Sequence, residues 1–379
     1  MINSDRLARR FKMLAEIDSI SREEKKIAEK LSDILKNMGA DVFFDDAGSK
    51  VGGNTGNLIA KFKGNVEAEP IFFSGHMDTV EPGRGVKVVF KEGVFKSDGT
   101  TILGADDKSA LAIILEVMDT ILEKKLPCPP VEIVFTICEE IGLLGAKAFD
   151  LSFLDSKLGY ILDSTETDGI VTKAPFADKI TIKVFGKDAH AGAAPENGIN
   201  AISVASRAIS TLDLGRIDHE TTCNLGKIKG GKATNIIPDF VIIHGESRSH
   251  DEKKLKNITA KIVDAFHDAA DYFRTDKNDL PRVEAIVERD FPGTNIPKTH
   301  KIVRLAKKAA ENIGKNMQTK TIGGGADSNI FFGKGLTAGV LGTGMTDVHT
   351  VRESVKLEDM ENSARLLLEI IKIRAAGEL

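Results

Sequence analysis

The first half of the chain alternates short apolar runs with amphipathic helical stretches. Each run is bounded by Gly, Asp or Pro, and the runs occupy residues 57–62, 70–74, 131–138 and 158–163. Apolar positions from Ile27 to Met38 recur at helical spacing and stop at Gly39. Ser21 and Glu24, just before them, predict a capping box. Strands that alternate with helices are typical of an α/β layer with a largely parallel sheet.

The pattern changes near residue 175. Residues 179–185 alternate polar and apolar positions, as an antiparallel strand with one solvated face does. A helix, two strands, a helix and a strand are then predicted at residues 199–212, 222–228, 239–246, 252–273 and 282–289. This order predicts an α+β ferredoxin-like sandwich. The α/β pattern resumes from residue 299 and ends in an amphipathic helix at 357–375, so residues 1–174 and 291–379 should form one domain interrupted by a second, 175–290.

Composition narrows the class of protein. The 379 residues carry 52 Lys and Arg against 56 Asp and Glu, a net charge of −4. This excludes bulk attraction to nucleic acid or to an anionic membrane as the main activity, and no apolar run reaches the roughly 18 residues of a membrane helix. The three cysteines share no short metal-type spacing. We therefore expect a reducing compartment, most simply the cytoplasm.

The candidate catalytic and metal-ligating residues lie where apolar runs end. His76 and Asp78 follow the run that ends at Ser74, and their spacing puts both on one side of an extended chain. A carboxylate beside a His suits a metal ligand with a group that orients it. The alternative is a loop His with a helix-capping Asp.

At four further places, acidic residues or a His lie next to an apolar segment. Asp106 and Asp107 precede an apolar helix, which they could simply cap. Glu139 and Glu140 follow a buried run, where adjacent carboxylates are costly unless a cation compensates them, although a plain solvated pair is the alternative. Asp163 closes another run, and His349 follows a Gly-rich apolar stretch. Taken singly, these two could be a turn former and a loop His.

Together these positions predict more than any one of them. Two His and several carboxylates, with one carboxylate available to bridge, suit two divalent ions a few ångströms apart. A spare Glu beside a ligand Glu could serve as a general base.

The motifs resemble the co-catalytic zinc exopeptidase family that contains peptidase T, bacterial glutamate carboxypeptidase, aminoacylase and succinyl-diaminopimelate desuccinylase. The resemblance rests on four segments, which run from His76 to Glu353 in the family's order: His76-Met77-Asp78-Thr79, Gly104-Ala105-Asp106-Asp107-Lys108, Glu139-Glu140-Ile141-Gly142 and His349-Thr350. It implies a zinc-exopeptidase-type catalytic domain with a central, mostly parallel sheet, and an inserted lid or dimerisation domain. The Ala-Asp-Asp-Lys and His-Met-Asp-Thr segments favour the peptidase T branch.

The resemblance also implies roles for these residues. Asp106 would bridge two metal ions, with His76 and Asp163 completing one site. Glu140 and His349 would complete the other. Glu139 would be the general base and Asp78 the orienter of His76. The ions would be Zn²⁺, with Mn²⁺ or Co²⁺ as alternatives, and the family's Asp-Asp peptide is often cis.

The inserted domain carries family features as well. His190, in His190-Ala191-Gly192, resembles the His that stabilises the developing oxyanion, which in dimeric members comes from the partner subunit. Asn235 and Arg248 match positions that hold the substrate, and the bidentate fork of an Arg suits a carboxylate. Gly324 lies in a Gly-rich segment that resembles the substrate loop. No Gly-Lys-Ser/Thr follows it, so it is not a phosphate loop.

The resulting hypothesis is a peptidase-T-like dinuclear metallopeptidase that cleaves short peptides as an aminopeptidase, and forms a homodimer through residues 175–290. A deacylase or desuccinylase acting on N-acyl amino acids is the nearest alternative. A catalytically inactive peptide-binding module is the alternative from another class.

Overall fold

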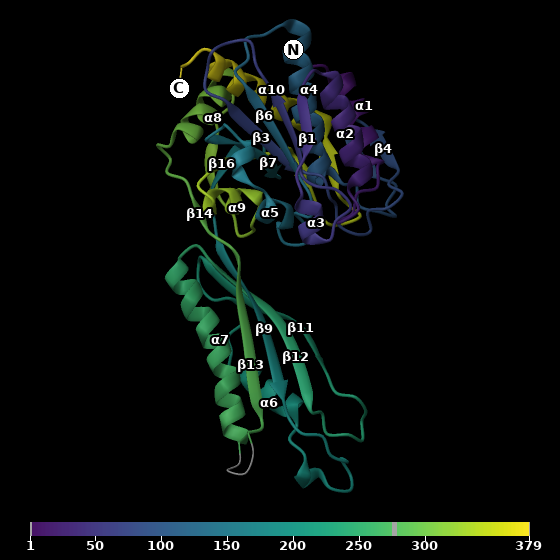
Figure 1. Ribbon diagram of the computed structural model, residues 1–379, viewed down its shortest axis with the longest axis vertical. Coiled ribbons are helices and arrows are strands. Elements are labelled where there is room, and N and C mark those ends of the chain that lie inside the picture. The colour runs from purple at the N-terminus through teal and green to yellow at the C-terminus, as the bar shows by residue number, and fades with distance from the viewer. Residues whose placement is uncertain (1, 275–278, 379) are drawn as a thin grey trace. The chain divides into compact units, whose positions relative to one another are not determined.

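The computed structural model describes residues 2–274 and 279–378. The chain divides into two compact units (Figure 1). Unit 1 comprises Met1–Lys173 with Thr294–Leu379, and unit 2 comprises Ala174–Gly293. Residues 175 and 290, the limits expected for the insertion, lie close to the bounds of unit 2. No helix within the described ranges is long and apolar enough to cross a membrane.

Unit 1 contains a nine-stranded sheet, in which four neighbouring strands, β6, β3, β7 and β16, run parallel. The flanking pairs β1–β2, β2–β6 and β8–β16 are antiparallel. The sheet is therefore mostly parallel at its centre, as the alternating pattern predicted. Its strands are β1 (Asp41–Phe44), β2 (Leu58–Phe62), β3 (Ile71–His76), β6 (Val131–Thr136), β7 (Leu158–Ser164), β8 (Gly169–Ala174), β14 (Thr294–Asn295), β15 (Gln318–Thr321) and β16 (Thr337–Gly342).

Helices cover both faces of this sheet. Phe72 contacts Phe331 of α9, whereas Phe73 stacks on Tyr160, whose hydroxyl donates to the backbone of Ile302 in α8. Because adjacent strand residues point to opposite faces, α8 and α9 lie on opposite sides of β3. The helices of unit 1 are α1 (Ser4–Ala15), α2 (Lys25–Asn37), α3 (Ala47–Val51), α4 (Ala105–Lys124), α5 (Leu144–Ala148), α8 (Lys301–Asn312), α9 (Asp327–Gly333) and α10 (Leu357–Ala375), with a 3₁₀ turn η1 (Leu151–Phe153).

A second, four-stranded sheet in unit 1 was not foreseen from the sequence. It consists of β4 (Val88–Lys91), β5 (Val94–Ser97), β17 (Met345–Thr346) and β18 (Ser354–Lys356). The pairing of β18 with β5 brings the last quarter of the chain beside residues that precede α4. The loop between β17 and β18 carries His349.

Unit 2 has the predicted order of strands and helices. Its antiparallel sheet runs β10-β11-β12-β9-β13, and α6 and α7 contact each other and the sheet (Figure 1). The short β10 is an addition to the four predicted strands. The elements are β9 (Phe176–Phe185), η2 (Pro195–Asn197), α6 (Ala201–Ser210), β10 (Gly215–Arg216), β11 (Thr221–Gly230), β12 (Phe240–Ser249), α7 (Glu252–Phe273) and β13 (Arg282–Phe291).

The predicted capping box at Ser21 and Glu24 is wrong. Helix α2 begins at Lys25, and Glu24 at its N-cap makes no side-chain cap hydrogen bond. The Ser21 hydroxyl donates instead to Asp78, at 2.6 Å, and Glu24 accepts the backbone amide of Cys138, at 2.9 Å. The side chains of Ser21 and Glu24 thus bind to the loops after β3 and β6, which are distant in the chain and carry the candidate site residues Asp78, Glu139 and Glu140.

Candidate metal centre

The candidate residues of unit 1 meet at the carboxyl ends of the four parallel strands. His76 is the last residue of β3, Glu139 and Glu140 follow β6, and Asp163 lies near the end of β7. His349 lies in a loop beyond β16. The carboxyl ends of parallel strands meet at one edge of a sheet, which is where α/β proteins place their sites.

Asp106 lies between the two histidines. Its Oδ1 is 3.0 Å from Nε2 of His76, and its Oδ2 is 3.2 Å from Nε2 of His349. Nε2 of His349 also lies 2.9 Å from Oε1 of Glu140. Ligand atoms of His76, Asp106 and Glu140 all lie within 4.8 Å of one another. One carboxylate that faces two imidazoles through different oxygens has the arrangement of a bridging ligand.

Asp106 is the second residue of α4, which begins at Ala105. The peptide bond between Asp106 and Asp107 is cis, as the resemblance implied. Asp107 accepts the backbone amide of His76 through Oδ2, at 3.2 Å, and so joins the start of α4 to the end of β3. Asp106 and Asp107 are both buried.

The carboxylate of Asp78 holds the turn that carries the two glutamates. Oδ1 accepts the backbone amide of Glu139, at 2.9 Å, and Oδ2 accepts that of Glu140, at 3.2 Å. Nδ1 of His76 lies 3.0 Å from the backbone oxygen of Asp78 and 3.4 Å from its Oδ1. Asp78 therefore contacts His76 mainly through its backbone, and its carboxylate serves the glutamates.

The electrostatics of the centre favour a cation. Burial raises the pKa of Glu139 well above its usual value, and burial followed by the charge of Asp106 does the same to Asp163. Although burial alone would lower the pKa of His76, hydrogen bonds with Asp106 and Asp78 raise it well above its ordinary value. Hydrogen bonds with Asp106 and Glu140 raise the pKa of His349 to about 10. The cluster thus has more buried carboxylates than its two imidazoles neutralise, and this donor set fits divalent ions.

Gly324 lies in the open segment before α9. A Cβ added at Gly324 would meet no atom within 4 Å, so the loop is unobstructed at that point. The residue that starts α9, Asp327, is 2% exposed and accepts a hydrogen bond from Thr136 at the end of β6. Sequence reasoning did not single out Asp327 as a site residue.

In unit 2 the three candidate residues do not form one cluster. His190 and Asn235 are neighbours, because the amide of Ala191 donates to the backbone oxygen of Asn235, at 2.9 Å. Asn235 precedes β12, whereas Arg248 lies near its far end, opposite Ala177 at the start of β9. At roughly 3.3 Å per residue, the length of β12 puts on the order of 25 Å between Asn235 and Arg248. One small ligand cannot contact all three residues within unit 2.

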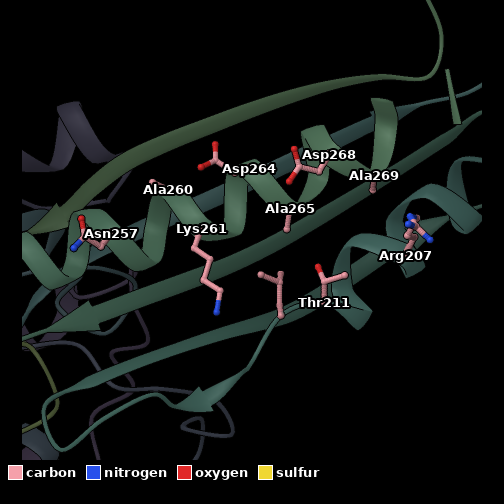
Figure 2. A pocket seen from close by; sticks show the side chains of 10 residues that line it. Arg207, Thr211, Asn257, Ala260, Lys261, Asp264, Ala265, Asp268 and Ala269 are labelled. Carbon is pink, nitrogen blue, oxygen red and sulfur yellow. The ribbon is translucent and has the colours of Figure 1, made fainter. Parts of the chain in front are cut away.

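A separate hollow of about 500 Å³ lies on unit 2 between α6 and α7 (Figure 2). Its charged residues are of both signs: Arg207, Lys261, Asp264 and Asp268. It has no imidazole or thiol among its described lining residues. The described lining of the hollow therefore lacks the imidazole ligands of a metal centre, whereas the cluster of His76, Asp106, Glu140 and His349 at the strand ends of unit 1 has them.

Two family models match separate parts of the chain. Residues 177–272 match a family model described as a peptidase dimerisation domain, and residues 57–173 match peptidase family M28.

Three whole-length relatives are similar to the chain. An aminopeptidase PepT from Bacillus cereus ATCC 10987 has a structure with a TM-score of 0.89 and 38% identity, with 99% of each chain covered. A tripeptidase from Staphylococcus aureus subsp. aureus Mu50 gives a TM-score of 0.92 at 37% identity, covering 99% of this chain and 100% of the other. The uncharacterized protein YqjE of Bacillus subtilis (strain 168) is 41% identical, over 98% of this chain and 99% of its own.

Proposed function

This chain belongs to the family of the PepT aminopeptidases and tripeptidases, and we propose how its residues carry out metal-dependent peptide hydrolysis. The observation that carries the proposal is the Asp106 carboxylate, which faces His76 through one oxygen and His349 through the other.

Two divalent ions would be held by five residues of unit 1. His76 and Asp163 would complete one site, Glu140 and His349 the other, and Asp106 would serve both. We propose Zn²⁺ for these ions, with Mn²⁺ or Co²⁺ as alternatives, because imidazole and carboxylate ligands suit them. When bound, the ions would activate a water molecule and polarise the scissile carbonyl as Lewis acids.

Glu139 would act as general base. Its side chain is 9% exposed and not among the three mutually close ligand residues, and burial raises its pKa well above the usual value. A carboxylate with a raised pKa can take the proton of the attacking water and return it to the leaving amine. Asp78 would fix the direction of Glu139 by holding its backbone amide.

The substrate would be a short peptide, and His190, Asn235, Arg248 and Gly324 would contact it. His190 would stabilise the charge of the tetrahedral state. Arg248 would bind a carboxylate of the peptide. Because His190 and Asn235 lie at the opposite end of β12 from Arg248, we propose a homodimer through unit 2, in which His190 and Asn235 serve the metal centre of the other subunit.

We also propose a cytoplasmic location. Cys128, Cys138 and Cys223 are free and buried in the structure, as suits a reducing compartment.

The proposal is tested by assaying purified protein of known metal content on tripeptides, dipeptides and N-acyl amino acids. We expect hydrolysis of tripeptides with release of the N-terminal residue, and two metal equivalents per chain. The variant Asp106→Ala should be inactive and hold no more than one equivalent. Preference for N-acyl amino acids would instead indicate a deacylase, and normal activity with two equivalents in Asp106→Ala would contradict the site.

A further inference from the structure

Glu353 is a buried carboxylate that the proposed mechanism does not use. It is 1% exposed and lies immediately before β18, at the end of the loop that carries His349. Its Oε2 accepts the backbone amides of Leu103, at 2.8 Å, and Gly104, at 2.7 Å. Its Oε1 accepts the backbone amide of Asp106, at 2.9 Å. One side chain thus binds three amides of the segment that presents the bridging ligand.

These three hydrogen bonds are of the strong kind. An ionised carboxylate that accepts backbone amides forms bonds about twice as strong as neutral ones, and they strengthen further where water is excluded. Gly104 has a φ of +75°, a left-handed conformation that turns the chain between the amide of Gly104 and that of Asp106, both of which donate to Glu353. Without Glu353, buried amides in this segment would lose their acceptor.

The segment that leads into β17 and the His349 loop is also joined to the start of α4. The hydroxyl of Ser109, in the first turn of α4, donates to the hydroxyl of Thr343, at 2.8 Å. Thr343 follows β16 directly. The segment from Thr343 to Glu353, which contains β17 and the His349 loop, is therefore joined at both ends to the start of α4 or to the residues just before it.

Between these two anchors His349 lies in a half-exposed stretch of unfavourable backbone conformation. Its side chain is 49% exposed, and its φ is +61°, a conformation that side-chain-bearing residues adopt at a cost. Asp347, two residues earlier, has a φ of +51°. Such a loop keeps its shape only when its surroundings hold it, and Glu353 supplies three of the bonds that do so.

We propose that Glu353 is a positioning residue of the metal centre, which holds the bridging Asp106 and the His349 loop at a fixed separation so that both can bind the same ion. This inference rests on the proposed two-metal centre. Glu353 acts through the backbone of the ligand segment and does not itself contact the metal or the substrate.

The test compares Glu353→Gln and Glu353→Ala with the wild-type enzyme by titration calorimetry with Zn²⁺ and by kcat at rising metal concentration. The Gln oxygen can still accept the amides of Leu103 and Gly104, but its NH₂ group would face the amide of Asp106. Loss of a residue that orients metal ligands typically weakens metal binding roughly 10- to 100-fold. We expect that loss for one of the two ions in Glu353→Gln, a larger one in Glu353→Ala, and recovery of kcat with excess metal.

Glu132→Gln is the matched control. Glu132 is also buried, at 3% exposure, and accepts the backbone amides of Asp155 and Ser156, but it lies near the other end of β6 from Glu139 and Glu140. Its loss should lower the unfolding temperature and leave the affinity for both ions unchanged. An equal loss of metal affinity in Glu132→Gln would show that any buried defect produces the effect, and would overturn the inference.

The wild-type measurement separates this inference from the proposed function. If the wild-type protein binds fewer than two ions or cleaves no peptide, the proposed function fails. If the wild type behaves as proposed and Glu353→Gln keeps both ions at wild-type affinity with unchanged kcat, the positioning role is wrong. Should Glu353→Ala fail to fold, Glu353→Gln decides the question.

Discussion

Oδ1 of Asp78 accepts the backbone amide of Glu139 at 2.9 Å, although 61 residues separate the two in the chain. The other oxygen accepts the amide of Glu140 and the hydroxyl of Ser21. Asp78 is fully buried, so these three donors supply the hydrogen bonds that water would give to an exposed carboxylate. The direction in which Glu139 and Glu140 project is therefore set by a carboxylate at the end of a neighbouring strand.

This contact predicts the effect of Asp78→Asn. An Asn has one acceptor oxygen, so its NH₂ group would face one of the two amides, and the turn would shift. We expect kcat to fall roughly 10- to 100-fold, with weakened metal binding at Glu140. Ser21→Ala, which removes one donor and leaves both amide bonds in place, should have a smaller effect. Steady-state kinetics and metal analysis of both variants check this, and a wild-type kcat in Asp78→Asn would contradict it.

Metal binding should release protons. In the protein without metal the pKa of His349 is about 10 and that of His76 is well above its ordinary value, so both imidazoles are charged at pH 7. A His must be neutral to bind a metal, so binding expels these protons and apparent affinity rises with pH through the neutral range. Calorimetry in buffers of different ionisation enthalpy should show at least one proton released per imidazole ligand, because burial also raises the pKa of the ligand carboxylates Glu140 and Asp163.

His349→Ala is the control for this prediction. It should release fewer protons than the wild type as it binds metal, because one charged imidazole has been removed. A binding enthalpy that does not change with the buffer would contradict the assignment of these histidines as ligands.

The proposed dimer predicts complementation between two inactive variants. His190→Ala lacks the proposed oxyanion group and Glu139→Gln lacks the proposed base. In a mixed dimer one subunit keeps Glu139 and would receive an intact His190 from its partner. Random mixing by unfolding and refolding should restore about a quarter of wild-type activity, because about half the dimers are mixed and each has one complete centre. No recovery in mixed dimers of demonstrated composition would show that His190 serves its own subunit.

Helices with a regular hydrophobic period, which residues close in the chain determine, were predicted well from the sequence. Helix α7 spans Glu252–Phe273 and helix α10 spans Leu357–Ala375, as their periodicity predicted. Their apolar faces repeat over many turns and so carry a strong signal. The small sheet of β4, β5, β17 and β18 was missed, because its short strands owe their pairing to segments far away in the chain.

The candidate site shows the same limit. Strand-end histidines and carboxylates were recognisable because each follows a buried apolar run. The partners of Ser21 and Glu24 were not, because a local capping box explains the same spacing and nothing in the sequence indicates that Asp78 and Cys138 compete for these side chains. The three amides that Glu353 binds, and the distance between Asn235 and Arg248, likewise depend on tertiary structure.

The measurement that tests the central claim most directly is the metal stoichiometry and kcat of Glu139→Gln and Glu140→Gln in one buffer. Loss of a general base costs roughly 10²- to 10⁴-fold in rate and leaves the metal site intact, whereas loss of a ligand weakens the ion itself. We predict that Glu139→Gln keeps both metal equivalents and binds substrate but loses nearly all turnover. Glu140→Gln should lose affinity for one ion, with partial rescue by added Zn²⁺ or Mn²⁺. If Glu139→Gln loses metal while Glu140→Gln keeps both ions, the two roles are exchanged and the mechanism is wrong at its centre.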